Sequence, residues 1–110
     1  MPVPQSAWIA LILAGLFEIG WPVGLKMAQT PGRAAAGIVL AALCMAVSGA
    51  LLWLAQKAIP LGTAYAVWTG IGAAGTFALG VALYGDPASL PRILGVALIV
   101  GGVVALKLAS

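Results

Sequence analysis

The chain of 110 residues contains only five basic and two acidic residues, and 64% of its residues are apolar. Soluble globular domains carry charges on about a quarter of their residues, so this composition excludes a soluble domain, and with it a soluble enzyme. Disordered chains combine low hydrophobicity with high charge, which excludes that class too. An integral membrane protein remains, and its basic residues are too scattered to indicate nucleic-acid binding.

Four long apolar runs follow one another along the chain, and short polar segments separate them. A membrane-spanning helix needs about 20 predominantly apolar residues. The runs therefore predict spans at about residues 4–25, 34–55, 61–85 and 91–109, without the alternation that barrel strands require. Short connections place neighbouring helices antiparallel. We expect an all-α membrane protein with a single four-helix transmembrane domain over residues 1–110.

Basic residues are nearly balanced between the two ends of the predicted helices. Lys26, Arg33 and Arg92 fall on one side of the membrane, and Lys57 and Lys107 fall on the other, together with the N-terminal amine. Orientation follows an asymmetry of Lys and Arg near the span ends. Because this sequence has almost none, it predicts dual topology, in which the chain inserts in both directions. The alternative is that lipids or partners decide the orientation.

Glu18 lies near the middle of the first predicted span, where no other residue is charged. A charge at this depth costs about 2.5–3.5 kcal/mol on insertion scales, so such residues mostly face a cavity and carry ions or protons. A cation and a proton exclude each other on the same carboxylate oxygens. One carboxylate is therefore enough for proton-coupled exchange of a cationic solute. The alternative is a protonated glutamate that only joins helices by hydrogen bonds.

Aromatic residues are spaced to share a helix face with this carboxyl group or with one another. Trp21 follows Glu18 by three residues, which places both on one face of the helix. Pro22 has no N–H, so the carbonyl of Glu18 loses its normal helical donor. Tyr65 and Trp68 are also three residues apart, in the third span. They offer a hydroxyl to a carboxylate and ring faces to a cation.

One hydroxyl and a pair of glycines complete the candidate residues. Ser48 is the strong hydroxyl donor of the second span, where it either joins helices or belongs to the site. Gly95 and Gly102 are seven residues apart on one face of the fourth span, and such stripes favour close helix approach. Four short helices enclose little space, so a solute cavity needs a second copy of the chain. We expect this stripe to form a subunit contact; the alternative is packing within one subunit.

Two segments resemble one known family. Residues 15–21, GLFEIGW, resemble the first helix of the small multidrug resistance transporters, and residues 60–72, PLGTAYAVWTGIG, resemble the third-helix signature of that family. The resemblance covers nearly the whole chain, including its size, its four spans and Lys107 near the end. Trp21 after the glutamate, and Thr69 with the glycines that follow it, are similar to the guanidinium exporter subtype.

This resemblance implies an antiparallel, dual-topology homodimer in the bacterial inner membrane, in which two copies of Glu18 share one site. It implies export of guanidinium and small guanidinyl cations by alternating access, in exchange for protons. Such a protein is not an enzyme, and we expect no catalytic residue, metal or cofactor, with the proton gradient as the energy source. Its expected partners are the cationic substrate, protons, the lipid bilayer and a second copy of the chain.

The resemblance also implies a role for each candidate residue. Glu18 binds the proton or the substrate, and three neighbouring side chains hydrogen-bond or orient it, namely Trp21, Ser48 and Trp68. Tyr65 helps to gate the site and couple the two fluxes. Two pairs of glycines are assigned to movement and assembly: Gly70 and Gly72 let the third helix bend, and Gly95 and Gly102 form the dimer contact.

Two further hypotheses remain open. Gly20 and Pro22 flank Trp21 where valine and alanine are more usual in the subtype, which keeps open an exporter of quaternary ammonium or other multidrug cations. A structural or rotor-ring subunit with a mid-span carboxylate is the third hypothesis. Those rings place the acid after a polar loop that this sequence lacks.

Overall fold

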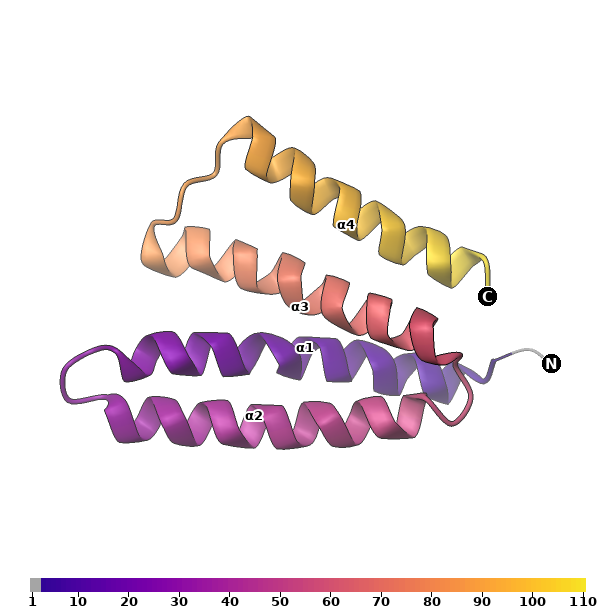
Figure 1. Ribbon diagram of the computed structural model, residues 1–110, viewed down its shortest axis with the longest axis horizontal. Coiled ribbons are helices and arrows are strands. Elements are labelled where there is room, and N and C mark those ends of the chain that lie inside the picture. The colour runs from indigo at the N-terminus through magenta and orange to yellow at the C-terminus, as the bar shows by residue number, and fades with distance from the viewer. Residues whose placement is uncertain (1–2) are drawn as a thin grey trace.

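The computed structural model describes residues 3–110, which form four α-helices joined by short turns (Figure 1). They are α1 (Gln5–Ala28), α2 (Ala34–Ala55), α3 (Leu61–Tyr84) and α4 (Leu90–Leu108). Each is long enough and apolar enough to cross a membrane. The beginning of α1 and the end of α4 lie at the same end of the molecule (Figure 1). The prediction of an all-α protein with four spanning helices is therefore confirmed.

The first helix is longer than the sequence predicts. It continues past Lys26 and ends at Ala28. A lysine in the last turn is compatible with the helix, because its positive charge lies close to the negative end of the helix dipole. The turn that follows contains Gly32 in a left-handed conformation, with φ of 81°. No end of the other three helices differs from the predicted spans by more than a single residue.

Helices α1 and α2 form an antiparallel pair whose backbones touch (Figure 1). A Cβ atom built on Gly24 would lie only 2.7 Å from the amide nitrogen of Ala41 and from the carbonyl oxygen of Gly37. A Cβ atom on Gly20 would collide with the side chain of Cys44. Small residues at such crossings let membrane helices approach closely. The glycines of α1 therefore serve packing within the subunit.

Helix α3 packs on the other face of α1 and completes the buried core. The core gathers near the start of α1, the end of α2 and the start of α3, where Leu11, Ile59 and Val67 are fully buried. Trp8 is only 5% exposed and belongs to the same cluster. This packing fixes how α3 is rotated relative to α1, and so decides which side chains of α3 face Glu18.

Helix α4 is attached differently from the other three. Of the other three helices, only α3 has its backbone close to that of α4, and α4 contains no buried residue. An apolar cavity of about 370 Å³ separates part of α4 from α1 and α3, and Lys107 lines one edge of it. Within the part of the chain that the structure describes, nothing lies within 4 Å of a Cβ built on Gly95 or Gly102. The predicted glycine stripe therefore does not serve packing within this subunit.

Candidate functional site

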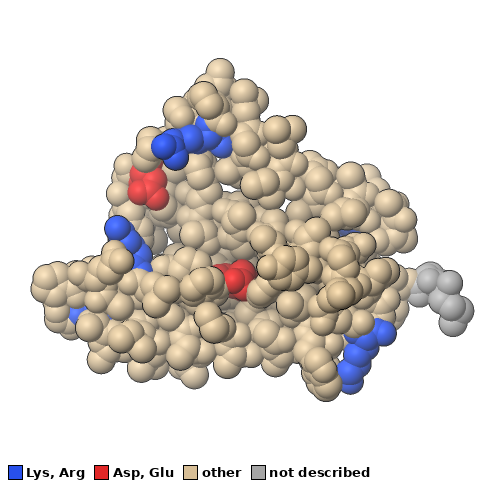
Figure 2. Space-filling view, viewed as in Figure 1, with Lys and Arg blue, Asp and Glu red and all other residues tan. Residues whose placement is uncertain are grey.

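Charged side chains are sparse on the surface, and one acidic group appears mid-length in an otherwise uncharged region (Figure 2). Glu18 is half-buried on α1, and its side chain passes over Gly72 of α3. A Cβ atom on Gly72 would lie 2.6 Å from Cγ of Glu18. Glycine at this position therefore makes the room that the glutamate side chain needs between the two helices.

One hydrogen bond holds Glu18 within its own helix, and side chains from both neighbouring helices lie beside it. The indole N–H of Trp21, one turn along α1, donates to Oε1 of Glu18. On the other side, Oε2 of Glu18 lies 3.5 Å from the hydroxyl oxygen of Ser48 on α2. The indole N–H of Trp68 on α3 donates to the same serine oxygen at 2.8 Å. The residues that the sequence groups around the carboxylate are thus brought together by three helices.

Ser48 is the most buried polar residue of the group, with 1% of its surface exposed. Its hydroxyl lies 2.7 Å from the backbone carbonyl oxygen of Ala14, a much shorter distance than the one to Glu18. A hydroxyl group has one hydrogen to donate. In this structure the hydroxyl therefore donates to Ala14, accepts from Trp68, and lies near Glu18 without a strong bond to it.

Tyr65 reaches the site through the ring of Trp68. The two ring centroids are 5.4 Å apart and the planes are inclined at 50°, a tilted arrangement that is favourable for aromatic pairs. Tyr65 is 56% exposed, so its ring forms part of the outer wall. Its position is compatible with a gating role, but that role stays a prediction.

A cavity of about 440 Å³ opens beside the carboxylate, and we call it the central cavity. Its lining comes from α1 and α3: Glu18, Trp21, Pro22, Tyr65, Trp68, Thr69, Gly72, Ala73 and Thr76. Among these described residues none is basic, so the carboxylate has no lysine or arginine partner there. Aromatic faces and a carboxylate together suit a small cation, which the rings attract through their electron-rich faces.

Two threonines of this lining are not among the residues that the sequence predicts for the site. Thr69 and Thr76 follow Tyr65 at four and eleven residues, on the face of α3 that also presents Gly72. Helical spacing from Tyr65 is the signal that would have found them. Pro22 also lines the cavity. Its ring therefore contributes to the shape of the cavity, in addition to removing a backbone donor.

The remaining predicted residues lie away from the carboxylate. Gly70 faces α4, where a Cβ atom would meet Val103 and would lie 3.3 Å from Cγ2 of Ile99. Helix α3 runs without a break through Gly70 and Gly72, so the bending role of these two glycines stays a prediction. Gly95 and Gly102 are on α4, outside the site.

Comparison with known proteins defines the class. The sequence profile of the family described as Small Multidrug Resistance protein matches residues 6–99. The chain therefore belongs to the small multidrug resistance family, as the motifs of the first and third helices predict. Together with four helices able to span a membrane, this makes it a multi-pass protein of the bacterial inner membrane.

Individual relatives narrow the class to a subtype. The chain is 52% identical over 104 residues to a protein of Yersinia pseudotuberculosis named guanidinium exporter, in a match that covers 94% of this chain and 99% of the relative. Proteins with the same name from Proteus vulgaris and Salmonella typhimurium are 47% and 46% identical over 94% of this chain, and these matches cover 99% and 98% of the relatives. The predicted resemblance to the guanidinium exporter subtype is confirmed.

Proposed function

We propose that this protein exports guanidinium and small guanidinyl cations across the inner membrane in exchange for protons, by alternating access. The observation that carries the proposal is the central cavity, in which Glu18 is held by Trp21 and no described lining residue is basic. The names of the relatives support guanidinium as the substrate. The protein acts as a transporter and performs no enzymatic step.

The chemistry of exchange follows from the single carboxylate. A guanidinium ion is planar and offers parallel N–H groups that match the two oxygens of a carboxylate. Its flat faces suit the rings of Trp68 and Tyr65, which line the same cavity. A proton on Glu18 removes the charge and one acceptor, so bound proton and bound cation exclude each other. Each transport cycle therefore exchanges one kind of cation for the other, with the proton gradient as the energy source.

The assembly that we propose is an antiparallel homodimer with dual topology, in which two copies of Glu18 face one shared site. Three features support it. The central cavity is lined by only two helices of the subunit, the stripe of Gly95 and Gly102 meets no other helix among the described residues, and basic residues are nearly balanced between the two ends. In this assembly the stripe forms the dimer contact.

Movement between inward-facing and outward-facing states is assigned to α3. Gly70 lies where α3 meets Val103 of α4, and Gly72 lies under Glu18. Bending between these two positions would change the wall opposite the carboxylate, while the side chain of Tyr65, on the same helix, opens or closes the cavity.

A second candidate function is export of small quaternary ammonium ions by the same mechanism. The observation that favours it is the position of Pro22 in the lining beside Trp21. A proline ring offers no acceptor to the N–H groups of guanidinium, whereas its CH₂ groups can pack against the methyl groups of a quaternary ammonium ion.

Purified protein in proteoliposomes tests both functions. Guanidinium or tetramethylammonium is supplied on one side, and proton movement is followed with a pH-sensitive dye inside the vesicles. We expect guanidinium to drive proton counter-flow, and tetramethylammonium to do so more weakly. Protein with Glu18→Gln is the control for leakage. Guanidinium movement without proton movement would contradict antiport.

A further inference from the structure

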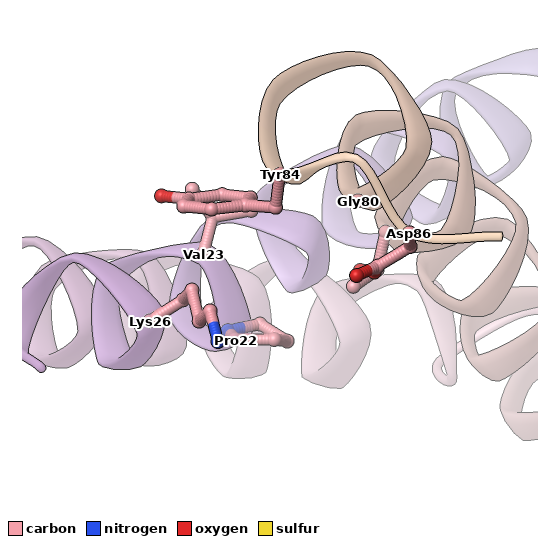
Figure 3. Close-up of a pocket in the computed structure, with 7 residues that line it drawn as sticks. Pro22, Val23, Lys26, Gly80, Tyr84 and Asp86 are labelled. Carbon is pink, nitrogen blue, oxygen red and sulfur yellow. The ribbon is translucent and has the colours of Figure 1, made fainter.

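A second cavity lies next to the central one, at the end of the molecule where α1 and α3 finish (Figure 3). We call it the outer cavity. Its volume is about 230 Å³, and its lining residues are Pro22, Val23, Lys26, Thr76, Gly80, Tyr84 and Asp86. Two of them, Pro22 and Thr76, also line the central cavity. Because the cavities share these walls, the outer cavity lies on a path between Glu18 and the end of the helices.

The distance along this path is short. Lys26 follows Glu18 by eight residues on the same helix, which corresponds to about 12 Å along the helix axis. Lys26, Tyr84 and Asp86 are all exposed, whereas Glu18 is half-buried. The outer cavity therefore offers a cation in the water at this end one route towards the carboxylate of Glu18, past these three side chains.

Backbone geometry holds the carboxylate of Asp86 at the outer cavity. Gly85 ends α3 in a left-handed conformation with φ of 67°, a region that glycine adopts easily. This turn brings the backbone N–H of Asp86 to the carbonyl oxygen of Gly80, at 3.1 Å. Gly80 also leaves room for the side chain, because a Cβ atom there would lie 3.3 Å from Cγ of Asp86 and closer still to Oδ2.

A positively charged group of the protein itself, the ammonium group of Lys26, already occupies part of the outer cavity. The ammonium nitrogen of Lys26 lies 5.9 Å from the centroid of the Tyr84 ring, within the range of a cation–π contact. Figure 3 shows Lys26 and Tyr84 on one side of the cavity and Asp86 on the other. A carboxylate and an aromatic face thus converge on a space that attracts positive charge.

Other lysines near helix ends show why this pair is distinctive. Lys57 lies over the ring of Trp53 at 4.3 Å, and Lys107 lies over Trp8 at 5.0 Å. Such contacts are expected where long side chains extend towards the membrane surface. Lys26 and Tyr84, in contrast, line a cavity together with an acidic side chain, that of Asp86.

We propose that the outer cavity is a second cation-binding station, in which Asp86 and Tyr84 receive the substrate cation before it reaches Glu18, and which Lys26 occupies between substrates. The proposal rests on the proposed function for the identity of the cation. Asp86 supplies the attraction, and the tethered ammonium of Lys26 competes for the same space. A guanidinium ion displaces it, since guanidinium bonds a carboxylate with two N–H groups and also stacks on a ring.

The first test is the kinetics of guanidinium exchange in proteoliposomes. Asp86→Asn removes the attraction, so KM is expected to rise about two- to fivefold, the range of an exposed cation–π or charge contact, with kcat nearly unchanged. Asp86→Glu retains the charge and is expected to recover most of the loss. Lys26→Gln removes the competitor, so KM is expected to fall by a similar factor. A rise of KM in Lys26→Gln would overturn its role as a competitor.

Arg33→Gln is the matched control for Lys26→Gln. Arg33 lies at the same end of the molecule, is exposed, and does not line the outer cavity. Its removal changes the net charge and the balance of basic residues between the two ends as much as removal of Lys26 does. We expect KM to stay at the wild-type value in this variant. An equal fall of KM in both variants would assign the effect to overall charge and would contradict the proposal.

A second test is independent of transport. The chain has two tyrosines, so ring-labelled tyrosine gives two NMR signals, and Tyr84→Phe assigns them. In Glu18→Gln protein, which lacks the central carboxylate, guanidinium is expected to shift the Tyr84 signal, and Asp86→Asn should abolish that shift. An unmoved Tyr84 signal overturns the outer station. If guanidinium shifts the Tyr84 signal but the wild-type protein does not exchange guanidinium in proteoliposomes, only the proposed function is overturned.

Discussion

The first and last helices of the subunit are held in opposite ways. Helix α1 packs backbone to backbone against α2, through Gly24 and Gly37, and also contacts α3. Helix α4 brings its backbone close to α3 alone and fully buries none of its side chains. Lipid tails are as apolar as leucine, so helices in a membrane are stabilised by close packing more than by escape from the solvent.

The difference indicates how stability and function are divided along the chain. The α1–α2 pair is a closely packed unit that carries Glu18 and Ser48. Helix α3 carries the facing residues Trp68 and Gly72, and α4 comes close to α3 alone and has no buried residue. The site therefore lies between the closely packed α1–α2 pair and α3. The other neighbour of α3 is α4, which is packed less closely.

The largest expected effect is at the carboxylate of the closely packed pair. Glu18→Gln keeps the shape of the side chain and removes its charge, so binding, proton coupling and transport of guanidinium through the central site should all be lost. Glu18→Asp should keep partial function, because it keeps the charge while its shorter side chain changes the bond to Trp21 and the distance to Ser48. Binding to detergent-purified protein and exchange in proteoliposomes measure these effects. Transport of guanidinium that persists in Glu18→Gln, with wild-type affinity, would falsify the shared site.

The second prediction concerns pH. A proton and guanidinium compete for the same carboxylate, so lower pH fills the site with protons and weakens apparent guanidinium affinity. Where the carboxyl group is mostly protonated, the loss should approach about tenfold for each pH unit, as linkage requires for one exchanged proton. Titrations by calorimetry from about pH 9 down to the lowest pH at which the protein stays folded measure it. An affinity that falls nowhere in this range would contradict competition.

The third prediction tests the close contact of the α1–α2 pair. Gly24→Ala places a Cβ atom 2.7 Å from backbone atoms of α2, so the helices must separate. Overpacking of this kind typically costs about 1–3 kcal/mol of unfolding free energy. Gly49→Ala in α2 is the control, because nothing described lies within 4 Å of that position. Unfolding in mixed detergent micelles compares the two, and equal stabilities would show that the contact is unimportant.

The fourth prediction concerns selectivity. The ring of Trp21 donates a hydrogen bond to Glu18 and narrows the space beside it. Trp21→Gly removes this ring. We expect weaker guanidinium transport, by about ten- to a hundredfold for the loss of a hydrogen bond to a charged group, together with admission of bulkier quaternary ammonium ions. Competition assays with a series of tetraalkylammonium ions measure the change. An unaltered order of substrates would remove Trp21 from the site.

The smallest expected effect on the isolated subunit is on α4. Gly102→Leu fills space that no described residue occupies, so the helical content and unfolding of the subunit should stay unchanged. If the glycine stripe is the dimer contact, the same substitution should weaken self-association, which cross-linking or analytical ultracentrifugation in detergent detects. Ala97→Leu is the control, because Ala97 is exposed and lies on another face of α4. Unchanged association in Gly102→Leu would assign the contact elsewhere.

Much of the fold could be predicted from the sequence because apolar runs broken by Pro, Gly and charge are strong signals for membrane helices. The carboxylate and Trp21 follow from spacing within one helix. The bond from Trp68 to Ser48 joins α3 to α2, and only the family resemblance indicated that these residues belong together. Contacts between helices depend on rotation about each helix axis, which a single sequence leaves open.

The outer cavity shows most clearly what could not be predicted from the sequence. Lys26 and Asp86 are far apart in the sequence, since Lys26 lies in the last turn of α1 and Asp86 follows the end of α3. They line one space because α1 continues past its predicted end and because Gly85 turns the chain back over Gly80. The sequence shows Gly85 before Asp86, but the direction in which the carboxylate points depends on the conformation of the turn that follows α3.

The hydroxyl of Ser48 has one hydrogen and two oxygens within reach, on Ala14 and on Glu18. The structure shows the short bond to Ala14, with the oxygen of Glu18 at the limit of hydrogen-bond distance. In the proposed cycle a charged Glu18 is the stronger acceptor and would draw the hydrogen, while the carbonyl of Ala14 would keep the helical bond from the N–H four residues on. Uptake of a proton by Glu18 would return the hydrogen to Ala14. We therefore expect Ser48 to convert a change of charge on α1 into a change of bond direction at its contact with α2.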